Sequence, residues 1–196
     1  MMSVSVLKSD FDVSLLYPAA TYSGGWKNDP SFIPQNKYCR SMGTPKGPDG
    51  KTLMASSGYR YGHGRCVYYN GEQASHSVYD GEWDKDKPHG KGKYTNKHGD
   101  VYDGEWVNGK KQGSGRMDFH TGQVYEGEFY QDMLHGVGRF SYEKSIYFDK
   151  DTREFVEATD IIEGIWANGN LVEQVATYTD YEILKSSTLN GEAFPK

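Results

Sequence analysis

Cysteine is scarce in this 196-residue chain: Cys39 and Cys66 are too few for a disulfide framework. No apolar run is long enough to cross a bilayer. The segment Met1–Lys8 lacks the basic stretch and apolar core of a secretory signal. These absences argue against a disulfide-rich secreted domain, and we expect a cytoplasmic chain with reduced thiols.

Aliphatic bulk and positive charge are also in short supply. Hydrophobic residues make up 36% of the chain, and a net charge of −5 offers no basic face for nucleic acid. Glycine and tyrosine are abundant instead, with 24 and 16 residues. Many rings and glycines with few aliphatic side chains indicate a thin structure, in which rings pack against backbone. No nucleic-acid partner is expected.

A motif of the form Tyr-x-Gly-x-aromatic occurs three times at a spacing of 23 residues. Eleven residues after each opening tyrosine begins a second motif, Gly-x-Gly-x and a large side chain. Recurrence at a fixed period indicates stacked copies of one structural unit. The three copies are Tyr79–Trp83 with Gly90–Tyr94, Tyr102–Trp106 with Gly113–Met117, and Tyr125–Phe129 with Gly136–Phe140.

Looser copies flank the three regular ones. Tyr22–Trp26 opens a first copy whose second half appears at Gly62–Gly64, and Ile162–Trp166 opens a last, partial copy. The longer intervals imply insertions near residues 29–60 and 143–160. The first insertion is rich in proline and glycine, which predicts an irregular loop. The second is compatible with an extra hairpin.

Each unit is interpreted as a β-hairpin. Side chains alternate along a strand, so Tyr79, Gly81 and Trp83 share one face, and Asp80 and Glu82 share the other. Glycine weakens a strand interior, so we expect a steric reason for it: a ring from a neighbouring strand lies over the bare backbone. The positions concerned are Gly81, Gly92, Gly104 and Gly115. On the charged face, Glu82, Glu105 and Glu128 lie on strands that are followed by the cations Lys91, Lys93, Arg116 and Arg139, and such opposite charges stabilise the sheet where they face each other.

The residue three positions after the aromatic slot is a turn signal in every copy. It is always glycine or aspartate, types that favour or tolerate turn geometry with positive φ. Asn108-Gly109 and Asn168-Gly169 are among the strongest hairpin dipeptides. The five turn residues are Asp29, Asp86, Gly109, Asp132 and Gly169.

These motifs resemble the MORN (membrane occupation and recognition nexus) repeat, which joins Tyr-x-Gly-x-Trp, a turn and His-Gly-x-Gly-x-aromatic. The resemblance is clearest over Tyr79–Val101, Tyr102–Val124 and Tyr125–Tyr142. It implies an elongated β-ribbon with a groove that holds a partner's helix or peptide, or that mediates dimerisation. Such repeats occur in radial-spoke and other cytoskeletal proteins, in membrane-junction proteins and in lipid kinases.

We therefore expect an all-β fold, an elongated single-layer antiparallel sheet of stacked MORN-type hairpins with irregular caps. The expected divisions are an N-terminal cap over residues 1–21, a repeat ribbon over 22–170 and a C-terminal cap over 171–196. Open sheet edges need cover, which we assign to Leu7–Pro18 and Val172–Leu184. The apolar spacing in Val172–Leu184 fits a short amphipathic helix slightly better than a strand, and both alternatives stay open.

Motifs for catalysis or for a cofactor are not found. Gly113–Gly115 and Gly62–Gly64 lack the Lys-Ser/Thr ending of a phosphate loop, and the repeat explains them. His89 and His135 stand two repeats apart, roughly 19 Å by strand spacing, too far to share a metal ion. No serine or cysteine lies in a nucleophile motif. We predict no enzymatic activity, no metal and no cofactor.

A cluster of lysines favours an alternative function. Clustered lysines attract anionic lipid head groups. Acidic residues such as Asp84 and Glu105 are interleaved with them, so a mixed surface is the preferred interpretation. The candidate lipid-binding residues are Lys85, Lys87, Lys91, Lys93, Lys110 and Lys111, with Lys97 nearby.

The preferred function is a non-enzymatic scaffold that docks partner proteins in a large intracellular assembly, in the cytoskeleton and especially the axoneme of cilia or flagella. The expected partners are a helix or peptide in the groove, subunits of a larger complex, or a second copy in a homodimer. Some rings of the repeats are expected to be free to anchor a partner. The predicted protein-binding trough is Tyr79, Trp83, Tyr102, Trp106, Tyr125 and Phe129. The alternative is a peripheral membrane tether that binds anionic phospholipids through the lysines.

Overall fold

The computed structural model describes residues 19–29, 31, 58–69 and 76–180. Every element in this part of the chain is a β-strand. Ten strands form one open antiparallel sheet, and the remaining two form a small sheet of their own. The predicted all-β architecture of stacked hairpins is therefore confirmed.

The strands follow the sequence repeat. The three regular units form the hairpins β3–β4, β5–β6 and β7–β8, and the two looser copies form β1–β2 and β11–β12. The bounds are β1 Ala19–Asn28, β2 Gly58–Tyr69, β3 His76–Asp84, β4 Lys87–Thr95, β5 Val101–Val107, β6 Lys110–Asp118, β7 Val124–Tyr130, β8 Met133–Ser141, β9 Ser145–Asp149, β10 Glu154–Ala158, β11 Asp160–Ala167 and β12 Asn170–Thr179.

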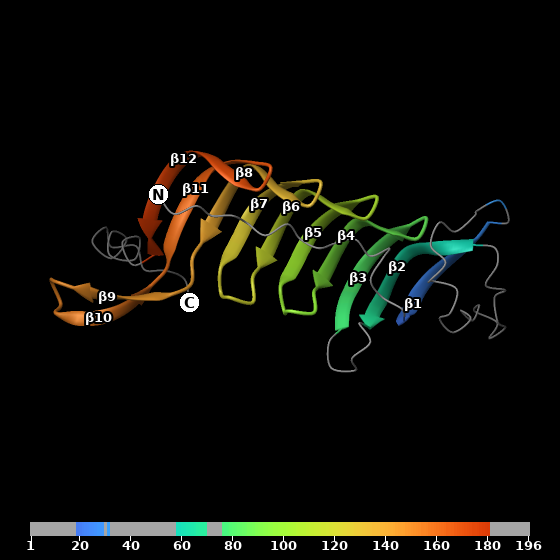
Figure 1. The fold of residues 1–196 in the computed structure, drawn as a ribbon, viewed down its shortest axis with the longest axis horizontal. Helices are drawn as coiled ribbons and strands as arrows, with labels where there is room; N and C mark the ends of the chain where they lie inside the picture. Colours follow the sequence, from blue (N-terminus) through green and yellow to red (C-terminus); the bar gives the residue numbers. More distant parts are fainter. Residues whose placement is uncertain (1–18, 30, 32–57, 70–75, 181–196) are drawn as a thin grey trace, which may run out of the picture.

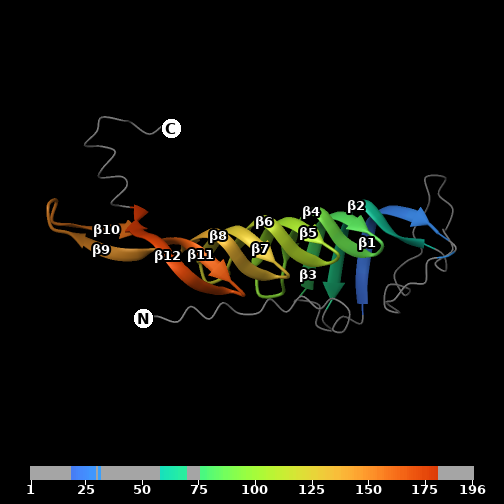
Figure 2. The same cartoon turned by 90° about the horizontal axis from the view of Figure 1, so that it is seen from above.

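The order of strands in the large sheet is the order in the chain, β1 to β8 and then β11 and β12. Each hairpin therefore pairs with the hairpins before and after it, as expected of a repeat array. Figure 1 shows the strands following one another along the long axis of the molecule, and Figure 2 shows the same row from above.

The hairpins of the regular units share an irregularity in strand pairing. In β3–β4 it falls between Gly81 and Trp83, and the facing Gly90 has φ +60°. The Glu82 side chain lies over this glycine, and its Oε1 accepts the N–H of Lys91 at 2.9 Å. A side chain at position 90 would both meet that carboxylate and need a left-handed backbone. Bulges of this kind bend a strand and increase its twist.

The turns at the ends of the hairpins agree with the sequence. Both central residues have positive φ, as at Asn108 (53°) and Gly109 (84°), which is the pattern of type I′ hairpin turns. The other turns with this pattern are Lys85-Asp86, Gln131-Asp132 and Asn168-Gly169. The fifth predicted turn residue, Asp29, differs: its Oδ1 accepts the N–H of Ser31 at 2.9 Å.

The second insertion forms the extra hairpin that the sequence allowed. Strands β9 and β10 pair with each other and not with the ten-stranded sheet. In Figure 2 this hairpin extends beyond the end of the ribbon where β12 lies. Most of the first insertion, the predicted loop at 29–60, lies outside the described residues, although Gly58–Arg60 belongs to β2.

The preference for a helix over Val172–Leu184 is wrong as far as that segment is described. Asn170–Thr179 is strand β12, which pairs with β11 along its length. Backbone pairing to a neighbouring strand satisfies the N–H and C=O groups that a helix would have paired internally. The rest of the segment, and the predicted N-terminal cover Leu7–Pro18, lie outside the described residues.

Candidate interaction surfaces

A single row of glycines crosses the ribbon. Each faces a glycine on the neighbouring strand, so that nine strands contribute one glycine each. The row is Gly24, Gly64, Gly81, Gly92, Gly104, Gly115, Gly127, Gly138 and Gly164.

A tyrosine ring covers two glycines in each of the four hairpins β1–β2 to β7–β8. A Cβ built at Gly92 would lie 2.6 Å from Cζ of Tyr79, so any side chain there would displace the ring. The Tyr79 hydroxyl donates to the carbonyl oxygen of Glu82 at 2.8 Å. The predicted ring-on-glycine contact is therefore present, with the ring covering one glycine of its own strand and one of the next. Tyr22, Tyr102 and Tyr125 repeat this arrangement.

Burial of these phenols changes their titration. Desolvation raises the pKa of Tyr22 to about 12 and raises the pKa of Tyr79, Tyr102 and Tyr125 still further. Neighbouring carboxylates contribute in the same direction, as Glu82 does for Tyr79. The tyrosines thus stay protonated well above the pH at which exposed phenols ionise.

Three indoles tie their hairpins to the preceding ones. Nε1 of Trp106 donates to the carbonyl oxygen of Gly92 at 2.8 Å, and its ring meets the Tyr79 ring edge-on at 5.3 Å between centroids. Trp83 donates in the same way to Gly64 at 2.8 Å, and Trp166 to Gly138 at 3.4 Å. Phe129 occupies the corresponding slot of β7 without an N–H group.

The six rings of the predicted protein-binding trough are core residues. The sequence predicts that some of these rings are free to anchor a partner. The structure buries all six, which are only 0–3% exposed: Tyr79, Trp83, Tyr102, Trp106, Tyr125 and Phe129. The reason is geometric, because each ring fills space between its own hairpin and a neighbour. Partner binding by these rings stays a prediction, and it would require the trough to open.

A backbone hydrogen bond joins each of the last four hairpins to the one before it. The carbonyl oxygen of a residue near the start of a hairpin's second strand accepts the N–H of the next hairpin's turn residue. The four joints are Arg60 with Asp86 (3.3 Å), Pro88 with Gly109 (2.8 Å), Lys111 with Asp132 (3.1 Å) and Leu134 with Gly169 (3.0 Å). A cation thus faces aspartate at two joints, and an apolar side chain faces glycine at the other two.

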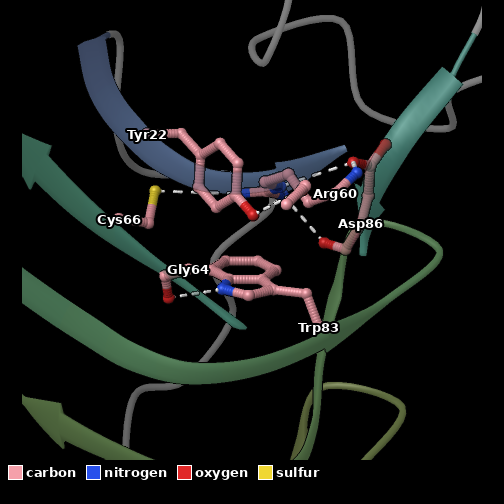
Figure 3. Close-up of polar contacts among 7 residues, drawn as sticks. Tyr22, Arg60, Gly64, Cys66, Trp83 and Asp86 are labelled. Atoms are coloured by element: carbon pink, nitrogen blue, oxygen red, sulfur yellow. Dashed lines mark hydrogen bonds and ion pairs between the residues drawn. The ribbon is translucent and has the colours of Figure 1, made fainter. Parts of the chain in front are cut away.

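Figure 3 shows the Arg60 joint. The guanidinium lies 4.0 Å from the ring centroid of Trp83, and its Nε is 3.3 Å from Oδ1 of Asp86. Its Nη2 donates to the Asp86 carbonyl at 2.8 Å, and its Nη1 donates to Sγ of Cys66 at 3.6 Å. Stacking on an aromatic face together with a paired carboxylate is the usual way to hold a buried arginine.

Lys111 forms the equivalent joint between β6 and the turn of the next hairpin. It is 2% exposed, its Nζ lies 5.1 Å from the Tyr102 ring centroid, and its N–H donates to Oδ1 of Asp132 at 2.9 Å. Burial lowers the pKa of Lys111 to about 8, and Asp132 only partly offsets this. Burial also raises the pKa of Asp132.

The predicted lipid-binding lysines are therefore not one group. Lys111 is buried and cannot meet a lipid head group, which corrects the expectation from the sequence. Its position in the repeat could have indicated this burial, because the equivalent position is Pro88 in the preceding unit and Leu134 in the following one. The other five are exposed: Lys85, Lys87, Lys91, Lys93 and Lys110.

The outer face carries a row of alternating charge, one residue from each of eight strands. Neighbours in this row are register partners, and Arg116 pairs with Glu126 directly. The row is Arg65, Asp80, Lys93, Asp103, Arg116, Glu126, Arg139 and Glu163. Of the predicted glutamates, only Glu105 faces a cation, Lys91, whereas Glu82 faces His63 and Glu128 faces Ser114 and His135.

The comparison with protein families agrees with this geometry. The family model of the MORN repeat matches three consecutive stretches, residues 79–101, 102–124 and 125–145. Each stretch begins at the tyrosine that covers the glycines of its hairpin. The chain is a MORN repeat protein. No curated protein matches the chain as a relative.

MORN repeats are modules for interaction with proteins or lipids. In this MORN protein the ring-on-glycine contact extends to a hairpin outside the matched residues, because Tyr22 covers Gly24 and Gly64. At the other end, β11–β12 keeps the Trp166 hydrogen bond to Gly138 but has Ile162 where the tyrosine stands. The repeat architecture is therefore longer than the matched segment.

The inserted β9–β10 hairpin has one exposed apolar face. Ile146, Phe148 and Phe155 are 72%, 52% and 76% exposed, and the two phenyl rings lie 5.3 Å apart. The hydroxyl of Tyr147 donates to Oδ2 of Asp160 at 2.7 Å and so ties the hairpin to β11. The sequence suggested a hairpin here but did not identify it as a binding site.

The histidines form no cluster with metal-ligand geometry. Within the described residues, no group of three or more His, Cys, Asp or Glu side chains could hold a metal ion. His120 instead braces a loop, with Nδ1 2.6 Å from Oδ1 of Asp100. In the same part of the chain, no helix is long and apolar enough to span a membrane.

Proposed function

We propose that this MORN protein is a non-enzymatic scaffold that docks partner proteins in a large intracellular assembly, within the cytoskeleton and specifically in the axoneme of a cilium or flagellum. The observation that carries the proposal is the burial of the aromatic rings inside the ribbon. They fill the trough of an open ribbon, so the long outer face and the exposed apolar groups remain as contact surfaces.

The acidic side chains of the repeats also support a structural role. Glu82 caps the N–H of Lys91, Asp132 caps the N–H of Lys111, and Asp86 holds Arg60. Carboxylates that brace bulges and joints in successive units serve the ribbon itself. A ribbon of this kind offers partners many copies of one surface at regular intervals.

The proposal is tested by fractionation of a flagellated cell that expresses the tagged full-length chain. The protein should remain with the axoneme after detergent extraction and should crosslink to axonemal proteins. Complete release with the detergent-soluble proteins, with no crosslinked partner, would contradict the scaffold function and its setting.

A second candidate function is a peripheral tether that binds anionic phospholipids. It is favoured by five exposed lysines that come from two adjacent units. It is disfavoured by the register, because Lys93 lies between Asp80 and Asp103 and Lys91 faces Glu105. Acidic residues on the neighbouring strands reduce the positive potential that would attract an anionic membrane.

Vesicle flotation separates the two functions. Salt-sensitive flotation with phosphatidylserine vesicles, lost on combined charge reversal of Lys91, Lys93 and Lys110, would establish the tether. The scaffold proposal predicts no flotation at low salt, and it predicts that the same charge reversal leaves axonemal retention unchanged.

A further inference from the structure

One end of the ribbon concentrates the exposed apolar surface. Of the ten large hydrophobic side chains that are exposed in the described part of the chain, seven lie between residues 137 and 175. Large apolar groups gathered at one place on a protein surface mark interaction sites, whereas scattered ones need no explanation. The seven are Val137, Ile146, Phe148, Phe155, Ile165, Val172 and Val175.

The inserted hairpin presents three of these side chains on one face. Phe148 and Phe155 are register partners, and Ile146 stands two residues before Phe148 on the same side of β9. Lys144 and Glu157 form an ion pair at 3.6 Å at the base of this face. An isolated two-stranded hairpin is only marginally stable in water, so burial of this face would stabilise it.

The charge of the same end determines what can cover it. Residues 143–180 contain nine acidic and three basic side chains, a net charge of −6, whereas the whole chain carries −5. The remainder of the chain is therefore close to neutral. At the hairpin itself, Asp151 is exposed in the turn between the strands, and Glu154 is exposed on the face of β10 opposite to Phe155.

This charge disfavours two occupants. A second copy would bring two segments of −6 together, and like-charge juxtaposition across an interface is costly. An anionic membrane surface would repel the same segment. A partner with apolar and basic side chains is complementary to both properties of this end.

We propose that the hairpin face formed by Ile146, Phe148 and Phe155 is the docking site for a basic amphipathic segment of another protein. This inference rests on the protein-docking function proposed above and gives that function a site and a partner chemistry. The apolar side of the segment covers the two phenyl rings, and its Lys and Arg side chains pair with the surrounding carboxylates.

The probe is a synthetic amphipathic helical peptide of leucine and lysine, titrated against the full-length chain by fluorescence anisotropy. Its matched control replaces every lysine by glutamate. The basic peptide should bind, with an affinity that falls as salt increases, and the acidic peptide should not. Equal binding of the two peptides would overturn the charge argument.

Substitutions locate the site. Phe155→Ser, and independently Ile146→Ser, should weaken the basic peptide about tenfold or more, because exposed anchors of this size carry much of an interface. Tyr130→Ser, at an exposed ring on a regular repeat, is the matched control and should change nothing. The combined charge reversal Asp151→Lys and Glu154→Lys should also weaken binding without touching the apolar face. Unchanged peptide affinity in both Ser variants would overturn the proposed site.

Binding of a second copy of the chain or of lipid to the hairpin face would give different experimental results. A concentration-dependent dimer abolished by Phe155→Ser would identify a second copy, and vesicle flotation abolished by it would identify lipid; either result overturns the proposal. In cells, loss of crosslinked partners from Phe155→Ser but not from Tyr130→Ser supports it. If both variants keep the same partners, the site is wrong and the scaffold function stands; if the wild-type chain has none, the scaffold function itself fails.

Discussion

Lys111 and Asp132 are joined by two reciprocal hydrogen bonds between adjacent MORN hairpins. The N–H of Lys111 donates to Oδ1 of Asp132 at 2.9 Å, and the N–H of Asp132 donates to the carbonyl oxygen of Lys111 at 3.1 Å. The joint of Leu134 and Gly169 keeps only the second bond, at 3.0 Å. The chain thus uses two different arrangements for the same contact.

The first prediction concerns replacing the Lys111–Asp132 joint with a leucine–glycine joint like that of Leu134 and Gly169. Asp132→Gly removes the carboxylate that accepts the Lys111 N–H and that partly offsets the burial of its ammonium, and should destabilise the chain by about 2 kcal/mol. Adding Lys111→Leu should recover most of this loss, because an apolar side chain facing glycine is the arrangement at Leu134 and Gly169. Urea unfolding measures both, with Lys110→Leu as the exposed control. A double variant no more stable than Asp132→Gly would refute the equivalence of the joints.

The second prediction concerns alkaline pH. Lys111 has a folded-state pKa of about 8 against 10.5 for the exposed group, so between these values the unfolded chain binds more protons. Stability conferred by this group therefore rises with pH in that window, by up to about 3 kcal/mol. The Lys111→Met variant should lack the rise, and an identical pH profile for both proteins would contradict the buried ammonium.

The third prediction concerns the tyrosines above pH 10. Their pKa values are raised on folding, to about 12 for Tyr22, so the folded chain holds protons that the unfolded chain loses. The stability that these tyrosines contribute is therefore fully present below pH 10 and is lost as pH rises above it. Exposed tyrosines such as Tyr130 ionise first, and the phenolate absorbance of the buried rings should appear only together with unfolding. Ionisation of all 16 tyrosines well before the loss of β-structure would show that these rings are exposed.

The fourth prediction concerns the glycine row. Gly92→Ala places a methyl group 2.6 Å from Cζ of Tyr79 and should cost about 3 kcal/mol. Combining it with Tyr79→Leu should cost less than the sum of the two single changes, because the clash is then removed. Chemical denaturation of the four proteins gives the interaction energy. Strict additivity would mean that the ring does not determine the need for glycine.

The hairpins of the repeat could be predicted from the sequence because the residues that specify them lie close together in the chain. The 23-residue period, the glycine pairs and the turn at Asn108-Gly109 specify hairpins without reference to distant contacts. The segment around Val172 is different, since its apolar residues fit both a helix and a strand, and pairing with β11 decides between them.

Burial was harder to predict than strand position. Lys110 and Lys111 are adjacent cations in the sequence, yet one is exposed and the other is 2% exposed beneath the next hairpin. The distinction depends on which unit follows, because Asp132 supplies the partner. The same applies to Trp106, whose N–H bonds a glycine of the preceding hairpin, so its availability to a partner cannot be judged from its own motif.

The aromatic trough is filled by the protein's own rings, which are buried in the folded chain. Acrylamide quenching of tryptophan fluorescence tests it directly in the Trp26→Phe variant, which retains Trp83, Trp106 and Trp166. These three indoles are 1–2% exposed, so the folded protein should be quenched several-fold less than the same protein in urea. Quenching as efficient as in the unfolded chain would contradict the account.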